Sequence, residues 1–268
     1  MTAGLLWAFL RRDAAIQVSY RSDLALQFAS AIFTLTLFFY LGELVDASAL
    51  ADDAGFDGGY FAFAIVGIAL LQIMQTGLAS FANRLRQEQL TGTFEALMAA
   101  PVSPAVVIVL TAVFDLVRAT VVGLVLIVVS VAIFGLSLSG GLVGLAAALV
   151  VLIGALTLFS ALGVLLASFG LVYKQTITLV GMTVTGLALL SGVYFPLEVL
   201  PEPLSAVGEL LPFTWAVDAM RAALLSGEVE IGRLSLLFAS AIVLMATGFV
   251  IFRLAFDRAR RDGSLSQY

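Results

Sequence analysis

The sequence has 268 residues, of which 62% are hydrophobic and 12% are charged, and its formal net charge is −5. A soluble globular domain is about half apolar and a quarter charged, so this composition indicates an integral membrane protein. The sequence has no cysteine and no histidine, which excludes disulfides, thiolate and imidazole catalysis, and the usual zinc ligand sets.

The first 22 residues are expected to form a helix that lies in the membrane interface. Leu6, Phe9 and Ile16 recur at helical spacing, and Arg11 lies elsewhere around the helix. Asp13 falls on the apolar face, so a simple continuation of the first membrane span remains the alternative. No cleavage site follows a short apolar segment, so we expect no removable signal peptide.

Six largely uncharged apolar stretches are long enough to cross a bilayer as helices. They are residues 24–44, 60–82, 106–134, 142–169, 176–193 and 234–256. The third and fourth stretches exceed the length that a bilayer requires, which predicts tilt or protrusion into water. The expected fold is therefore all-α, with six transmembrane helices.

Basic residues gather in alternate connections, which fixes the predicted orientation. They are Arg11, Arg12, Arg21, Arg84, Arg86, Lys174, Arg258, Arg260 and Arg261. The connection over residues 43–59 has five acidic residues and no basic one. Because short loops rich in Lys and Arg stay in the cytoplasm, both termini are predicted to be cytoplasmic.

The stretch over residues 194–233 does not resemble a plain loop. It is largely apolar, and Pro196, Pro201, Pro203 and Pro212 interrupt it. Non-helical backbone at membrane depth survives only where protein or a water-filled cavity covers it. A pair of short re-entrant helices on the outer side is the preferred interpretation, and an amphipathic loop flat on the outer surface is the alternative.

The cytoplasmic connection over residues 83–104 reads NRLRQEQLTGTFEALMAAPVSP. Its central part predicts a short amphipathic helix that ends at Pro101, with Phe94 and Leu97 on the apolar face and Glu88 on another. Such a helix either lies on the lipid interface or inserts into a groove on a soluble partner. Its spacing alone leaves both interpretations open.

Two motifs in these segments carry a family resemblance. The first consists of Glu88, Gly92, Thr93, Phe94, Glu95, Leu97 and PVS at 101–103. The second consists of GVYFPLEVLP at 192–201, LPFT at 211–214, DAMR at 218–221 and Gly227. In this order they resemble the signatures of ABC-2 type transporter permeases, the membrane-spanning subunits of ABC exporters. Phe94 stands where that family usually has Leu, and Leu211 where it commonly has Asn.

The resemblance implies a role for each motif within a single ABC-2 type transmembrane domain over residues 1–268. The first motif would be a coupling helix that docks on an ATPase subunit. Its expected contact residues are Arg84, Arg86, Glu88, Gly92, Thr93, Phe94, Glu95, Leu97 and Pro101. The second would form the outer re-entrant helices, which act as a gate. Its expected residues are Tyr194, Phe195, Pro196, Glu198, Pro201, Pro212 and Arg221.

The resemblance also implies the assembly and its location. We expect a homodimer in the plasma membrane of a prokaryote, with membrane lipids and a soluble ABC ATPase as partners and no nucleic acid. The expected cargo is an amphipathic, lipid-like, drug or lipid-linked glycan molecule, which is exported along a path between the two permeases. ATP and Mg²⁺ would be used by the partner ATPase.

The chain itself is not expected to hydrolyse ATP or to bind a cofactor. It has no Walker A sequence, and its only lysine, Lys174, lies in LVYKQT without a glycine-rich loop to hold phosphates. An intramembrane hydrolase is disfavoured, because the Ser-His and metal-dependent arrangements need histidine.

Asp115 and Arg118 lie three residues apart inside the third predicted span, and hence on one helical face. They either form a structural ion pair near the cytoplasmic end of a long helix or line the transport path. The alternative function is an ion-coupled secondary transporter that uses Asp115 as its titrating carboxylate. No inverted repeat of the kind common in such carriers is evident.

Two weaker patterns accompany these motifs. Gly140 and Gly144 have the small-xxx-small spacing that permits close helix contact, although glycine is frequent in this sequence. Aromatic residues of the first two spans are expected to meet near the outer surface, as an aromatic belt or as packing. They are Phe33, Phe38, Phe39, Tyr40, Tyr60, Phe61 and Phe63.

Overall fold

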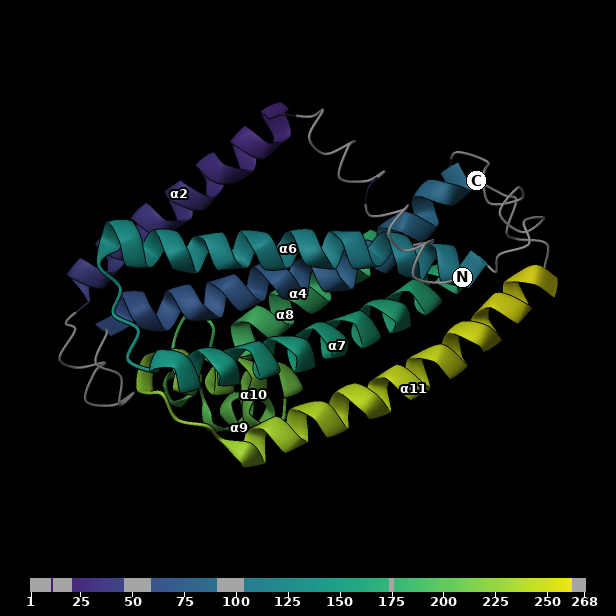
Figure 1. Ribbon diagram of the computed structural model, residues 1–268. Helices are drawn as coiled ribbons and strands as arrows, with labels where there is room; N and C mark the ends of the chain where they lie inside the picture. Colours follow the sequence, from purple (N-terminus) through teal and green to yellow (C-terminus); the bar gives the residue numbers. More distant parts are fainter. Residues whose placement is uncertain (1–10, 12–20, 46–58, 91–103, 174–175, 262–268) are drawn as a thin grey trace.

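A computed structural model describes residues 11, 21–45, 59–90, 104–173 and 176–261, and all regular structure in these ranges is helical. The long helices are α2 (Arg21–Leu44), α4 (Gly59–Leu90), α6 (Pro104–Phe134), α7 (Gly141–Tyr173), α8 (Thr176–Leu190) and α11 (Ile231–Arg261). Figure 1 shows these helices running side by side along the molecule, with α2 diverging from α4 and α6 toward its N-terminal end.

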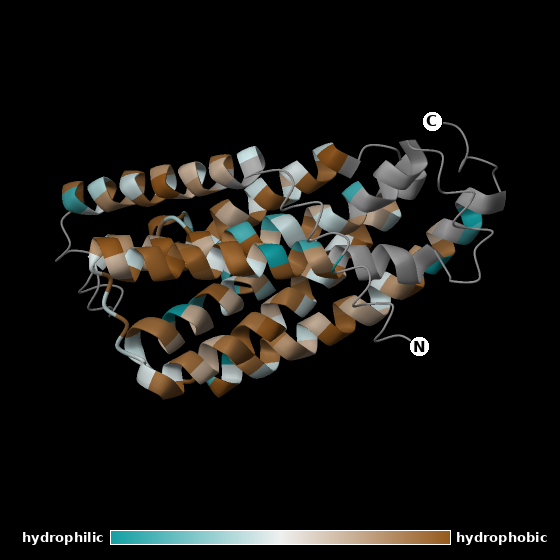
Figure 2. Ribbon diagram, turned by 45° about the horizontal axis from the view of Figure 1, so that its top comes forward, coloured by the Kyte–Doolittle hydropathy of each residue, from teal (hydrophilic) through white to brown (hydrophobic). Residues whose placement is uncertain are grey.

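Within the described residues, four helices are long and apolar enough to cross a membrane. Their apolar segments are Gly59–Phe81, Val113–Phe134, Gly141–Phe169 and Ile231–Ala255. Two shorter apolar helices, Phe28–Leu44 and Ile177–Leu190, accompany them. Hydrophobic residues cover most of the length of the long helices (Figure 2). The all-helical membrane fold is therefore confirmed, and a count of six spans remains a prediction.

Helix α8 is shorter than the stretch that the sequence predicted to end at residue 193. It ends at Leu190, and Gly192 follows with φ +67°, a left-handed conformation that glycine adopts most readily. The apolar residues after Leu190 therefore leave the helix and begin the connection to α11.

Helix α4 forms the centre of the bundle, where it packs against α6 and α7 and also contacts α2 and α8. Residues 62–71 of α4 are all buried. Close packing against α7 depends on small residues. A Cβ atom on Gly77 would lie 2.7 Å from Cβ of Phe159, so the two helices meet more closely there than a larger residue would allow.

The two ends of the bundle carry different charges. One end, called the basic end here, holds the C-terminal ends of α4 and α11. Its arginines are Arg84, Arg86, Arg258, Arg260 and Arg261. The opposite, acidic end holds the connections after α6 and α8. Its acidic residues include Glu43, Glu198, Glu202, Glu209 and Glu228.

Helix α4 continues beyond its apolar segment at the basic end. It runs from Phe81 to Leu90 without a break, so the predicted coupling segment begins as part of α4 rather than as a separate helix. Arg84, Arg86 and Glu88 belong to this extension. The predicted contacts Gly92, Thr93, Phe94, Glu95, Leu97 and Pro101 lie outside the described residues, as does most of the predicted interfacial helix.

Candidate functional site

The connection between α8 and α11 folds into short helices at the acidic end of the bundle. They are η1 (Leu197–Val199), α9 (Glu202–Glu209), α10 (Pro212–Arg221) and the π-helical turn η2 (Ala222–Ser226). Pro196 and Pro201 directly precede η1 and α9, and Pro212 is the first residue of α10, where the missing N–H costs least. The predicted pair of proline-bounded helices is present, and its re-entrant position in the membrane remains a prediction.

Helices α9 and α10 differ in how deeply they are buried. Helix α10 packs against α4, α7 and α11, and the Phe213 ring meets that of Phe159 edge-on with centroids 5.4 Å apart. Most of α9 is exposed. The Thr214 hydroxyl of α10 donates a hydrogen bond to the carbonyl of Gly208 at 2.6 Å, which joins the two helices across their turn. This half of the connection is thus enclosed by the bundle.

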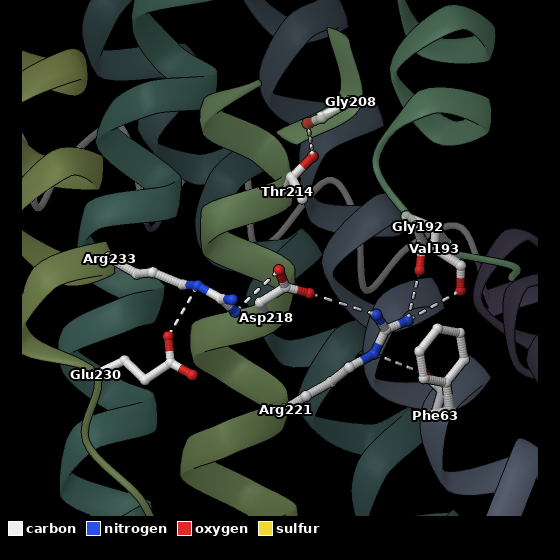
Figure 3. A network of polar contacts seen from close by, with 9 residues as sticks. All are labelled: Phe63, Gly192, Val193, Gly208, Thr214, Asp218, Arg221, Glu230 and Arg233. Atoms are coloured by element: carbon white, nitrogen blue, oxygen red, sulfur yellow. Dashed lines mark hydrogen bonds and ion pairs between the residues drawn. The ribbon is translucent and has the colours of Figure 1, made fainter. Parts of the chain in front are cut away.

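Arg221, the last residue of α10, is the largest fully buried side chain of the described residues, with 2% of its surface exposed. Its Nε donates a hydrogen bond to the carbonyl of Phe63 at 3.0 Å. Its Nη2 donates to the carbonyls of Gly192 at 2.8 Å and Val193 at 3.2 Å (Figure 3). The guanidinium carbon also lies 3.4 Å from the centroid of the Phe63 ring, a cation–π contact. Arg221 therefore fastens α10 both to α4 and to the segment after α8.

Gly67 lies one helical turn after Phe63 and makes room for this arginine. A Cβ atom there would lie 2.8 Å from the carbonyl oxygen of Val193 and 2.9 Å from Nη2 of Arg221. Side-chain carbons essentially never approach other atoms so closely. Sequence reasoning missed Gly67, because a glycine inside an apolar helix gives no sign of the distant residue that it accommodates.

A short chain of alternating charges leads from Arg221 to the surface. Asp218 Oδ1 lies 3.8 Å from Arg221 Nη1, and Asp218 Oδ2 lies 3.0 Å from Nη1 of Arg233 at the start of α11. Arg233 Nε in turn lies 2.8 Å from Glu230 Oε2 (Figure 3). The sequence placed Arg221 in the gate motif but did not predict the ion pair with Arg233.

Burial changes the pKa values of the two innermost groups in opposite directions. Burial raises the pKa of the Asp218 carboxyl, and the positive charges of Arg221 and Arg233 act against that rise. Burial lowers the pKa of the Arg221 guanidinium to about 9, against the influence of Asp218. Arg221 therefore remains positively charged at neutral pH, and three backbone carbonyls and one carboxylate surround it.

Gly140 and Gly144 pack closely against η2, the π-helical turn that follows Arg221. A Cβ atom on either residue would collide with the carbonyl oxygen of Ala223, and the amide of Gly140 donates a hydrogen bond to the carbonyl of Leu224 at 3.4 Å. The close approach that their spacing predicted is therefore made with η2. Gly227 ends η2 with φ +73°.

Aromatic rings gather at the acidic end, as the sequence predicted. Tyr194 stacks on Phe38 with centroids 6.1 Å apart, and Phe38 stacks on Tyr60 at 6.4 Å. Phe39 meets Phe61 edge-on at 5.5 Å. These contacts join α2 and α4 to the segment that supplies carbonyls to Arg221. Tyr40 is exposed but meets Phe39 edge-on at 5.7 Å. Phe33 is exposed, and Phe63 lies under Arg221.

The other predicted site residues lie apart from Arg221. Glu198 is exposed and Phe195 half-buried in the segment around η1. No ion pair joins Asp115 to Arg118 in the structure, although both belong to the described part of α6. Arg118 instead lines a cavity between α2, α4 and α6. Among the described residues, no group of three or more acidic side chains is placed to hold a metal ion.

Comparison with protein families gives an independent assignment. Residues 4–225 match the ABC-2 type transporter family, whereas no curated protein matched the sequence. The match includes the first motif, the second motif as far as Arg221, and every helix from α2 to α10. Because it covers most of the chain, the protein belongs to the ABC-2 type transporter family and is the membrane subunit of an ABC transporter.

Proposed function

We propose that this protein is the permease of an ATP-driven exporter, in which two copies form the transport path and each copy binds one soluble ATPase. One structural observation supports the coupling. Helix α4 is continuous from Phe63, which binds Arg221, to Leu90, where the predicted coupling segment continues. At 1.5 Å per residue this distance is about 40 Å, enough to cross the membrane.

The proposed mechanism follows from the stiffness of that helix. Closure of the ATPase subunits would push on residues 83–104 at the basic end. A hydrogen-bonded helix moves largely as a rigid body, so the displacement would reach Phe63 and Gly67 at the other end. Arg221 would pass it to α10, and the Asp218–Arg233 ion pair would pass it to α11. The outer helices would then move relative to α7 and open or close the path.

The proposed orientation places the basic end in the cytoplasm, with both termini inside and six membrane spans. The separation of charge between the two ends supports it, because basic residues favour the cytoplasmic side. The few charges of the spans favour an amphipathic or lipid-like cargo. Uptake instead of export in reconstituted vesicles would contradict the proposed direction.

The experiment that tests the assembly is affinity purification of the detergent-solubilised chain from its host. We expect a soluble ATPase to co-purify with the wild type and to be lost with Glu95→Arg, which reverses a charge in the predicted docking segment. Glu43→Arg is the matched control, because Glu43 is exposed at the acidic end, where no ATPase would bind. A folded dimer without any ATPase would contradict the proposal, and Asp115→Asn would then test ion coupling.

A further inference from the structure

A cavity of about 280 Å³ lies between α2, α4 and α6, away from the Arg221 contacts. Its polar lining residues are Ser30 and Thr34 of α2, Gln72 and Thr76 of α4, and Arg118 of α6. Apolar residues such as Ile68 and Leu126 complete its walls. A cluster of polar groups inside apolar helices is costly unless something satisfies it, so this cavity requires an explanation.

The cavity lies in the half of the membrane nearer the basic end. Gln72 is 13 residues from Gly59, where α4 begins at the acidic end, and Arg118 is 16 residues from Phe134, where α6 ends there. These separations correspond to depths of about 20 and 24 Å from the acidic end, within a hydrocarbon core about 30 Å thick. With the basic end inside, the cavity therefore faces the cytoplasmic leaflet.

The hydrogen-bonding groups of the cavity favour an anion. The Thr34 hydroxyl donates to the carbonyl of Ser30 at 2.9 Å, and the Thr76 hydroxyl donates to the carbonyl of Gln72 at 3.1 Å. Their protons are thus already used within their own helices. Among the described lining residues, the remaining donors are the Arg118 guanidinium, the Gln72 amide and the Ser30 hydroxyl. A guanidinium with neighbouring neutral donors matches a phosphate oxygen pair well.

The charge of the cavity points the same way. None of the described residues that line it is acidic, and no ion pair to Arg118 is present among the described residues. Asp115 lies about one turn away on α6 and is not a lining residue. The positive charge of Arg118 at this depth is stabilised when an anion binds beside it.

We propose that this cavity binds the phosphate group of an anionic membrane lipid from the cytoplasmic leaflet. Helix α2 forms one wall and exposes apolar side chains along its length, Leu26, Ile32 and Phe33 among them. Lipid tails would contact the α2 wall of the cavity, and a lipid that places its phosphate on Arg118 would keep its acyl chains against α2. Binding there is independent of the direction of transport and of the ATPase.

The test is a thermal unfolding titration of the purified full chain with phosphatidylglycerol, phosphatidylcholine or inorganic phosphate. We expect saturating phosphatidylglycerol to raise the melting temperature of the wild type by about 3 °C relative to phosphatidylcholine. Arg118→Gln should abolish that shift. Arg253→Gln, which removes an exposed arginine of α11, should retain it.

The separate ligands distinguish the source of the phosphate. A shift with the lipid alone identifies a lipid headgroup, and an Arg118-dependent shift with inorganic phosphate as well identifies a free phosphate as a second ligand. If Arg118→Gln does not fold, Gln72→Leu removes a donor from the same cavity and should reduce the shift. An equal shift in wild type and in both cavity variants would overturn the proposal.

Discussion

The Nε atom of Arg221 donates a hydrogen bond to the backbone carbonyl of Phe63, a residue 158 positions earlier in the chain, and the arginine lies over the ring of the same phenylalanine. This contact joins the end of α10 to the part of α4 near the acidic end. The hydrogen bond is accepted by a backbone atom, so a substitution of Phe63 would affect only the stacking of its ring on the guanidinium. The hydrogen bond itself requires the Arg221 side chain.

Arg221→Met is therefore expected to destabilise the protein strongly. Methionine fills part of the space but leaves the carbonyls of Phe63, Gly192 and Val193 without their donor, at a cost of about 3–5 kcal/mol. The measurement is the melting temperature in detergent. Arg253→Met, at an exposed position of α11, should change it little. Equal melting temperatures for the two variants would show that the buried junction contributes no stability.

Gly67→Ala tests the close approach from the other side. The added methyl would lie 2.8 Å from the carbonyl oxygen of Val193, so α4 or the segment after α8 must shift, at a cost of about 1–3 kcal/mol. Gly181→Ala is the matched control, because Gly181 lies inside α8 with no atom within 4 Å of its added Cβ. The control should be neutral or slightly stabilising, since alanine favours a helix. A wild-type melting temperature for Gly67→Ala would mean that the segment after α8 shifts to accommodate the methyl group at little cost in free energy.

These residues show how far the sequence predicts the site. Pro201 and Pro212 mark the starts of α9 and α10, because proline disrupts the interior of a helix but is tolerated in its first turn. This local effect can be predicted directly from the sequence. Arg221 was predicted as a site residue because it belongs to the DAMR segment of the second family motif. Its partners were not predicted, because three of them are backbone carbonyls, which every residue carries. The role of Gly67 depends only on Val193 and Arg221, which approach it in the folded structure but lie far from it in the sequence.

The membrane fold shows the same division between local and distant effects. Long apolar stretches predicted the helices well, since every backbone group in a membrane needs an internal partner and a helix supplies one. The early end of α8 was missed, because apolar residues continue past Leu190 while the left-handed Gly192 turns the chain. The cavity around Arg118 was missed for another reason. Gln72 and Ser30 belong to other helices, and only packing brings them near Arg118.

The absence of cysteine from the sequence allows a direct test of orientation. We expect Ser226→Cys, an exposed position at the end of η2, to react with a membrane-impermeant maleimide in intact cells. Ser264→Cys in the C-terminal tail should react only after the membrane is opened. The cysteine-free parent serves as the blank for both. Labelling of Ser264→Cys in intact cells would reverse the proposed orientation and place the predicted coupling segment outside.

A break in α4 tests whether that helix transmits force between the predicted coupling segment and Arg221. Gln75 is exposed on α4 and lies between Phe63 and the helix end at Leu90. Gln75→Pro removes a helical hydrogen bond and introduces a kink, at a cost of about 3 kcal/mol, whereas Gln75→Ala keeps the helix straight. We expect the proline variant to retain its ATPase partner, because the docking segment is unchanged, but to transport its substrate at least tenfold more slowly.

The measurements are co-purification of the ATPase, the melting temperature of the complex and transport in reconstituted vesicles. Gln75→Gly is a milder variant, with a cost of about 1 kcal/mol, and it should show an intermediate loss if stiffness matters. If Gln75→Pro only destabilised the protein, co-purification of the ATPase and transport would be lost together. Both losses would then follow the decrease in melting temperature. Wild-type transport by a folded Gln75→Pro complex would show that α4 does not carry the displacement, and the path from the ATPase to Arg221 would then have to run through another helix.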